Sequence, residues 1–335
     1  MPRCRCSTCR NWDSPEQRRG ACVSQTIVIA LGGNALGESL AEQMAAVKVT
    51  SRSIVDLIEG GHRVVVTHGN GPQVGMIDLA VEAAAMTEAH TPHLPMSVCV
   101  ALSQGYIGYD LQNALREERL SRGLQVSVAT LITQVIVDEH DPAFQAPTKP
   151  IGSYFPRAEA EVQMRNGYVM KEFPGKGFRR VVASPRPLDV VEKDSVLALV
   201  RAGHLAIAVG GGGIPVVRQG LHLKGAAAVV DKDWASAKLA ELIEADLLII
   251  LTTVEKVALH FGTPEQRWLD RLSVAQAREY MRAGHFAPGS MLPKIEAAVE
   301  FAESRPGREA LITCLTKAHD GIQGRTGTRI GGPAG

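Results

Sequence analysis

Two lysines of this sequence stand where a lysine is locally unfavourable. Lys232 lies in the run Asp231-Lys232-Asp233, directly before an expected helix, and Lys294 follows Pro293, a residue suited to the first turn of a helix. A cation at a helix N-terminus opposes the helix dipole and costs some stability. Two such exceptions favour a functional interpretation, in which both lysines neutralise an anion. The alternative is ordinary, because most lysines are solvated surface residues and Asp233 would serve equally as a plain helix cap.

Three glycine-rich loops each follow an apolar run of strand length. The loops are Gly32-Gly33-Asn34 after residues 26–31, His68-Gly69-Asn70-Gly71 after residues 63–67, and residues 210–213, which include Gly211 and Gly212, after residues 205–209. In open α/β sheets, ligands bind beyond the carboxyl ends of the strands. Glycine there lets backbone N–H groups approach an anion, and a following helix adds the positive end of its dipole. One such loop is usually only a turn, whereas three predict an anion-binding crevice.

The elements that must position these residues are predicted by hydrophobic patterning. Continuous β-branched runs at 26–31, 63–67, 126–132, 205–209 and 246–251 are typical of strands buried on both faces. Helix-period segments lie between them, at 39–59, between 74 and 118, and at 233–245. The predicted fold class is therefore α/β, with a mainly parallel sheet that helices cover.

Residues 138–181, which contain five prolines and several glycines, interrupt this alternation of strand-length runs and helix-period segments. An insert of this size in an α/β chain whose other connections are short is typical of a small subdomain or lid. We expect it within one domain of residues 25–330, followed by a short tail at 331–335. Residues 1–24 are expected to be a disordered extension rich in cysteine and arginine. Its cysteines supply only half of a paired metal-ligand pattern, so no metal site is predicted.

Composition and missing motifs exclude several classes of function. Of the 335 residues, 45% are hydrophobic and only 4% aromatic, and the formal net charge is +1. These values argue against nucleic-acid binding and against attraction to an anionic membrane. No apolar run reaches the length of about 18 residues that a membrane span needs, and the N-terminus has no apolar signal core, so a cytoplasmic location is expected. A P-loop, a dinucleotide fingerprint and the common hydrolase motifs are also absent from the sequence.

Several segments resemble the carbamate kinase family, which has the amino-acid-kinase fold. They include ALGGNAL (30–36), GNGPQVG (69–75), PTKPIG (147–152), GGGGIPVV (210–217), AVVDKDWASAKLA (228–240) and GHFAPGSMLPKIEAAVEF (284–301). The resemblance covers about residues 25–330. It implies a three-layer α/β/α sandwich with a protruding lid, and a homodimer. The implied reaction is ATP + carbamate = ADP + carbamoyl phosphate, run toward ATP in arginine, citrulline or ureide catabolism.

The same resemblance assigns roles to individual residues. Lys232 and Lys294 would stabilise the transferring phosphoryl group, Asp233 would orient them, and Lys149 would reach in from the lid. The residues implied to bind substrate or phosphate are Gly32, Gly33, Asn34, Asn70, Gly71, Gly211 and Gly212. Those implied to border the nucleotide are Thr252, Thr253, Val254 and Met291. The implied cofactor is Mg²⁺, held mainly by the phosphates of ATP or ADP.

One segment departs from the family pattern. Residues 172–177 read Glu-Phe-Pro-Gly-Lys-Gly, whereas the family pattern is closer to Glu-Asp-Ala-Gly-Arg-Gly. We expect Pro174 to stiffen the return strand of the lid, and Lys176 cannot reproduce the two-pronged hydrogen bonding of an arginine. Two alternative functions stay open at this stage: another phosphotransferase on the same fold, and a non-catalytic ligand-binding relative.

Overall fold

The computed structural model describes residues 24–32, 40–87 and 91–331. Residues 1–23 of the predicted extension, residues 332–335 of the tail, and Gly33 and Asn34 of the first glycine loop lie outside the described residues. Within the described ranges, no helix is both long and apolar enough to cross a membrane.

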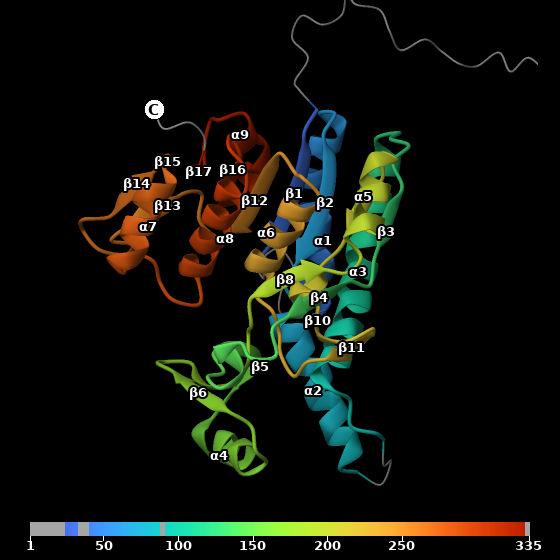
Figure 1. Cartoon of the computed structure of the whole chain (residues 1–335), viewed down its shortest axis with the longest axis vertical. Helices are drawn as coiled ribbons and strands as arrows, with labels where there is room; N and C mark the ends of the chain where they lie inside the picture. Colours follow the sequence, from blue (N-terminus) through green and yellow to red (C-terminus); the bar gives the residue numbers. More distant parts are fainter. Residues whose placement is uncertain (1–23, 33–39, 88–90, 332–335) are drawn as a thin grey trace, which may run out of the picture.

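In the described part of the chain, eight strands form a central sheet in the order β15-β17-β16-β12-β1-β2-β9-β3 (Figure 1). Their bounds are Arg271–Leu272 (β15), Thr328–Gly331 (β17), Glu309–Cys314 (β16), Leu247–Thr252 (β12), Thr26–Leu31 (β1), Arg63–His68 (β2), Leu205–Ile207 (β9) and Val128–Thr130 (β3). All neighbouring pairs in this order are parallel except β16–β17. The prediction of a mainly parallel sheet is confirmed. Strand β17 ends one residue beyond the expected domain limit of 330, because Gly331 pairs with Glu309.

Helices cover both faces of this sheet. The side chains of Ile27 and Ile29 in β1 pack with α1 (Leu40–Glu59) and α3 (Met96–Ser121). The alternate side chains of Val28 and Ala30 belong to a second core cluster, with α6 (Lys232–Leu242) and α8 (Met291–Glu303). Because successive side chains of a strand point to opposite faces, a strand between two helical layers is apolar throughout. The three-layer sandwich is thereby confirmed.

The remaining helices and a hairpin surround this sandwich. The helices are α2 (Gly71–Ala85), α5 (Lys193–Arg201), α7 (Val274–Arg282) and α9 (Ala318–Ile322). Strands β13 (Val257–Leu259) and β14 (Arg267–Leu269) pair as an antiparallel hairpin. The predicted strand at 205–209 is shorter than expected, because Val209 adopts a left-handed conformation (φ 52°) and a tight turn at Gly210–Gly212 follows.

A four-stranded sheet in the order β11-β10-β4-β8 was not predicted from the sequence. Its strands are β11 (His222–Gly225), β10 (Ile214–Gln219), β4 (Gln134–Val137) and β8 (Pro187–Val190). Three of them carry exposed positions, so their apolar patterns are short and interrupted. The sheet flanks the lid segment on both sides in sequence and thus anchors its two ends to the body of the protein.

The proline-rich segment contains a small sheet in the order β5-β7-β6, with strands β5 (Lys149–Phe155), β7 (Gly177–Val182) and β6 (Met170–Phe173). Helix α4 (Arg157–Arg165) covers it, and we call residues 149–182 the small subdomain. Figure 1 shows it in green, protruding from the sandwich near α2. Pro174 lies in the turn between β6 and β7 and not in a strand, so the expectation that it stiffens the return strand is wrong.

Helix α2 and the small subdomain meet through two glycines. A Cβ atom at Gly75 would lie 2.1 Å from the backbone nitrogen of Gly152. Gly152 itself has a φ of 69°, which side chains rarely adopt. The two backbones therefore touch directly, and no other residue type fits at position 75 without moving the subdomain.

Candidate active site

The N-terminus of α6 presents three charged residues to a cavity: Asp231, Lys232 and Asp233. Asp231 is the helix cap, since its Oδ1 accepts a 2.9 Å hydrogen bond from the backbone nitrogen of Asp233. Lys232 and Asp233 form the first turn and are almost fully buried, with 9% and 3% of their surfaces exposed. Gly69 leaves room for this arrangement, because a Cβ atom there would lie 3.3 Å from Cδ of Lys232.

Asp233 joins the two lysines that the sequence singled out. Its Oδ1 accepts a hydrogen bond from Nζ of Lys232, and its Oδ2 accepts one from Nζ of Lys294 at 2.8 Å. Burial opposes the charged form of this carboxylate, but the two adjacent cations outweigh it and hold its pKa well below the usual range. Lys294 lies in the first helical turn of α8, so the ion pairs tie the N-termini of α6 and α8 together.

The two lysines experience their surroundings differently. Burial and the neighbouring Lys294 lower the pKa of Lys232, despite the attraction of Asp233. For Lys294, burial also disfavours the charge, but the charge and hydrogen bond of Asp233 prevail and raise its pKa. A bound anion would stabilise the charged form of both.

Lys149 brings a third cation to the same place from strand β5. Its Nζ forms an ion pair with Oδ2 of Asp231. The cavity that these groups share has a volume of about 300 Å³ and is lined by Gly32, Lys149, Asp231, Lys232, Asp233, Leu251, Thr252, Thr253, Gly289, Ser290, Pro293, Lys294 and Leu315. Three lysines face two carboxylates there, so the cavity has a net positive charge and suits an anionic ligand.

The glycine loops contribute unequally to this cavity. Gly32 lines it, at a point where a Cβ atom would lie 2.8 Å from the carbonyl oxygen of Leu251. Gly211 and Gly212 do not line it. Both have positive φ angles, and they pack against the side chain of Asn70 and the backbone of Val230. Their shape supports the neighbouring loops, which is a role that the spacing alone did not reveal.

Asn70 and Gly71 stand at the start of α2. Asn70 is buried, and its Nδ2 donates a 2.8 Å hydrogen bond to the hydroxyl of Ser103. Gly71 lies near Pro150 of the small subdomain, since a Cβ atom there would be 3.8 Å from its carbonyl oxygen. The second glycine loop thus lies between the sandwich and the small subdomain.

Of the residues expected to border the nucleotide, two line the cavity. Thr252 ends strand β12 and Thr253 follows it, beside Ser290 and Leu315. Val254 and Met291 are not among the lining residues; Met291 packs in part against the large core cluster.

Two features of the candidate site were not predicted from the sequence. Asp231 reads in sequence as a helix cap, and nothing there indicates that its second oxygen pairs with Lys149. The other feature is a hydrogen bond of 3.0 Å from the indole nitrogen of Trp234 to Oε2 of Glu296, which connects α6 and α8. Arg186 stacks on the Trp234 ring at 3.6 Å and donates to the same Glu296 oxygen.

Comparisons with known proteins identify the family of this chain. Residues 25–314 match the amino acid kinase family. The chain belongs to this family. Its match with a carbamate kinase-like protein, YqeA of Escherichia coli, is 68% identical and covers 92% of this chain and 99% of that protein.

Two proteins named as carbamate kinases are also similar to this chain. The carbamate kinase of Clostridium perfringens is 49% identical, over 91% of this chain and 99% of its own. A solved structure of the carbamate kinase of Giardia lamblia, bound to AMP-PNP, superposes with a TM-score of 0.84 at 38% identity, covering 92% of this chain and 98% of that one. The amino-acid-kinase fold predicted from the sequence is therefore confirmed, and so is the resemblance to carbamate kinases.

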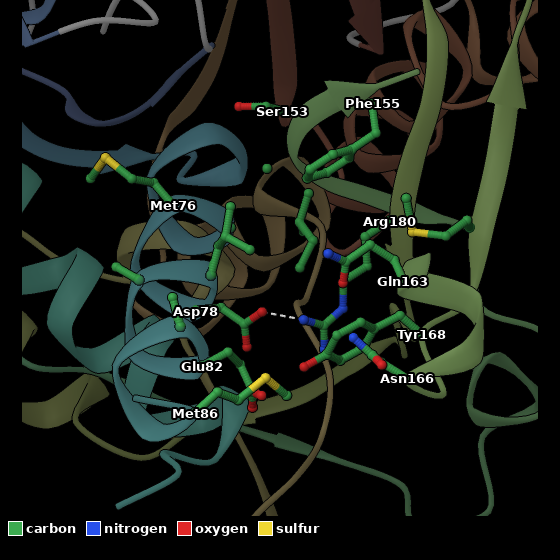
Figure 2. A pocket seen from close by; sticks show the side chains of 17 residues that line it. Met76, Asp78, Glu82, Met86, Ser153, Phe155, Gln163, Asn166, Tyr168 and Arg180 are labelled. Atoms are coloured by element: carbon green, nitrogen blue, oxygen red, sulfur yellow. Dashed lines mark hydrogen bonds and ion pairs between the residues drawn. The ribbon is translucent and has the colours of Figure 1, made fainter. Parts of the chain in front are cut away.

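A second, larger cavity of about 470 Å³ lies between α2 and the small subdomain (Figure 2). Apolar side chains such as Met76 and Phe155 line much of it. At one side, Asp78 of α2 forms an ion pair with Arg180 of β7, whose guanidinium stacks on Tyr168 at 3.9 Å. The small subdomain is thus attached to α2 by a glycine contact and an ion pair, with open space beside them.

Proposed function

We propose that the protein is a carbamate kinase, which transfers a phosphoryl group reversibly between ATP and carbamate and runs mainly toward ATP. The observation that carries the proposal is the cluster of Lys149, Lys232 and Lys294 around two carboxylates in one cavity. Phosphoryl transfer requires mainly positioning and neutralisation of charge, which this cluster supplies. The named carbamate kinases at 49% identity and with a TM-score of 0.84 support this substrate.

The charged residues of the cavity have separate roles in the reaction. In the direction of ATP synthesis, a terminal oxygen of ADP attacks the phosphorus of carbamoyl phosphate, and the P–O bond to carbamate breaks. Lys232 and Lys294 stabilise the negative charge on the transferring group, and Asp233 fixes their ammonium groups. The leaving carbamate is a stable oxyanion, so no general acid or base is needed, and none of the three lysines has to lose its proton.

Four further residues of the cavity keep the roles that the resemblance implied, whereas Gly211 and Gly212, which do not line it, are not assigned to the substrate. Lys149 grips the phosphoryl group from the small subdomain, and Gly32 offers a backbone N–H. Thr252 and Thr253 border the nucleotide, with Val254 and Met291 farther out. The two carboxylates that line the cavity are both paired with lysines, so their chemistry fits an Mg²⁺ ion that arrives on the nucleotide phosphates as part of the substrate.

We also propose a homodimer and a cytoplasmic role in arginine, citrulline or ureide catabolism. Support for the dimer comes from exposed apolar side chains on α3, where Leu102 (48% exposed) and Tyr109 (67%) lie seven residues apart and so share one helix face. Large apolar side chains exposed on one helix face are typical of an interface.

The test is a coupled assay of ATP formation from carbamoyl phosphate and ADP. We expect turnover by the native protein and a loss on the order of 100-fold or more in Lys294→Ala, because one partner of the transition-state charge is removed. Lys48→Ala, on the exposed side of α1, is the matched control and should retain full activity. Turnover of acetylglutamate, aspartate or UMP with ATP in place of carbamate would point to another phosphotransferase, and no turnover of any substrate would point to a binding protein.

A further inference from the structure

Asp231 makes contacts of two kinds with its two carboxylate oxygens. Oδ1 accepts the backbone hydrogen bond that caps α6, at 2.9 Å from the nitrogen of Asp233. Oδ2 pairs with Nζ of Lys149, which belongs to the small subdomain 82 residues away in sequence. One carboxylate thus joins the helix that carries Lys232 and Asp233 to the strand that carries the third lysine.

This pairing places a long side chain that would otherwise be poorly ordered. A free lysine has many rotamers, and fixing it in one of them costs conformational entropy. The side chain of Lys149 is 25% exposed, whereas that of Asp231 is 12% exposed and held by the helix cap. The carboxylate is the fixed partner, and the lysine is the one that it orders.

The second carboxylate cannot take over this task. Asp233 already has one oxygen on Lys232 and the other on Lys294. Among the carboxylates that line the cavity, Asp231 is therefore the one available to Lys149 within the described residues.

We propose that Asp231 is a positioning residue, which acts through Lys149. It holds the Lys149 ammonium group at the cavity before the phosphoryl group arrives, and the phosphoryl oxygens then compete for the same ammonium group. This inference rests on the proposed function, because it assigns Lys149 to a phosphoryl group.

A double-mutant cycle separates this role from the role of Asp231 as a helix cap. Asn is as good a cap as Asp, so Asp231→Asn removes the ion pair while the cap is retained. We expect Asp231→Asn to lower kcat/KM for carbamoyl phosphate about 10-fold and Lys149→Met about 100-fold, the range for hydrogen bonds of charged groups. The double variant should be no worse than Lys149→Met, and Asp194→Asn on the exposed face of α5 should match the native protein. A double variant that loses the product of the two single effects would overturn the proposal.

Hydrogen exchange of the ligand-free protein provides a readout that does not depend on activity. Both Asp231→Asn and Lys149→Gln should accelerate exchange of the amides of β5 several-fold and to the same extent, because each removes the same ion pair. Unchanged exchange in both would contradict the proposal even if the enzyme is active. Native protein that fails to make ATP, but shows this paired acceleration, would disprove the proposed function and leave the positioning role of Asp231 intact.

Discussion

Trp234 and Glu296 are joined by a hydrogen bond of 3.0 Å that links α6 and α8, the helices that carry Lys232 and Lys294. Trp234 follows Asp233 directly, and Glu296 lies two residues beyond Lys294. This bond and the Lys294–Asp233 ion pair of 2.8 Å at the cavity therefore connect the N-terminal parts of the two helices at two points.

Removing the indole donor should loosen this alignment without removing a charge. In Trp234→Phe we expect kcat to fall about 5-fold, which corresponds to the loss of one hydrogen bond of about 1 kcal/mol, with KM for ADP nearly unchanged. Trp268→Phe is the control, because Trp268 is 48% exposed on the β13–β14 hairpin. Equal kcat values for both variants would show that the Trp234–Glu296 bond has no part in positioning.

Asp233→Asn should reduce stability as well as activity. The substitution leaves Lys232 and Lys294 close together without a counter-charge, and breaking a buried pair in this way costs about 3 kcal/mol. Because neighbouring lysines lower the pKa of Asp233 in the folded state, its contribution is complete above the unfolded pKa and is lost as the pH falls through the folded value. Urea unfolding should therefore show a large difference between native and variant protein at pH 7 that shrinks toward pH 3. A difference that stays constant over this range would contradict the assignment.

His68 should make the protein less stable in mild acid. It is fully buried, and burial, aided by the charge of Lys232, lowers its pKa to about 4, although its bond to Gly69 opposes this. The unfolded chain binds a proton below about pH 6.5. The folded protein does not bind it until about pH 4, so the free energy of unfolding falls as the pH drops between these values.

The effect of His68 is measurable by substitution. Between pH 7.5 and pH 5 we expect the native protein to lose about 2 kcal/mol that His68→Asn does not lose. His140→Asn is the control, since that side chain is 84% exposed. Identical pH dependence in native protein and His68→Asn would rule out a neutral buried histidine.

Two helix glycines should respond in opposite ways to alanine. Gly105→Ala in α3 should be neutral or stabilising by up to about 1 kcal/mol, because a Cβ atom there meets nothing within 4 Å. Gly75→Ala in α2 should cost about 1–3 kcal/mol and expose the small subdomain to protease, because the methyl group would collide with Gly152. Urea unfolding of the two variants measures the stability change, and limited proteolysis measures the exposure of the small subdomain. Resistance of both variants equal to that of the native protein would show that the backbones do not touch.

Most of the central sheet could be predicted from sequence because the burial of each strand is evident from the strand's own residues. Strands such as β1 and β12 are buried on both faces and therefore read as continuous apolar runs. The four-stranded sheet and the small subdomain have half-exposed strands, whose patterns are too short to stand out.

The candidate site was predictable in its charges and less so in its contacts. Lys232 and Lys294 violate a local rule, so their positions are informative. Asp231 obeys every local rule, and only the folded chain brings Lys149 to it. Gly211 was expected beside an anion, but the shape of its loop serves the packing of Asn70.

The contact between Gly75 and Gly152 also affects where strand β5 places Lys149. Neither glycine has a side chain that could keep α2 and β5 apart, so the two backbones meet at this point. Lys149 lies three residues from Gly152, about 10 Å along an extended strand. A turn of about ten degrees would therefore move its backbone by about 2 Å. A displacement of this size is enough to break a hydrogen bond of the Lys149 ammonium group, because such bonds span only about 2.7–3.2 Å.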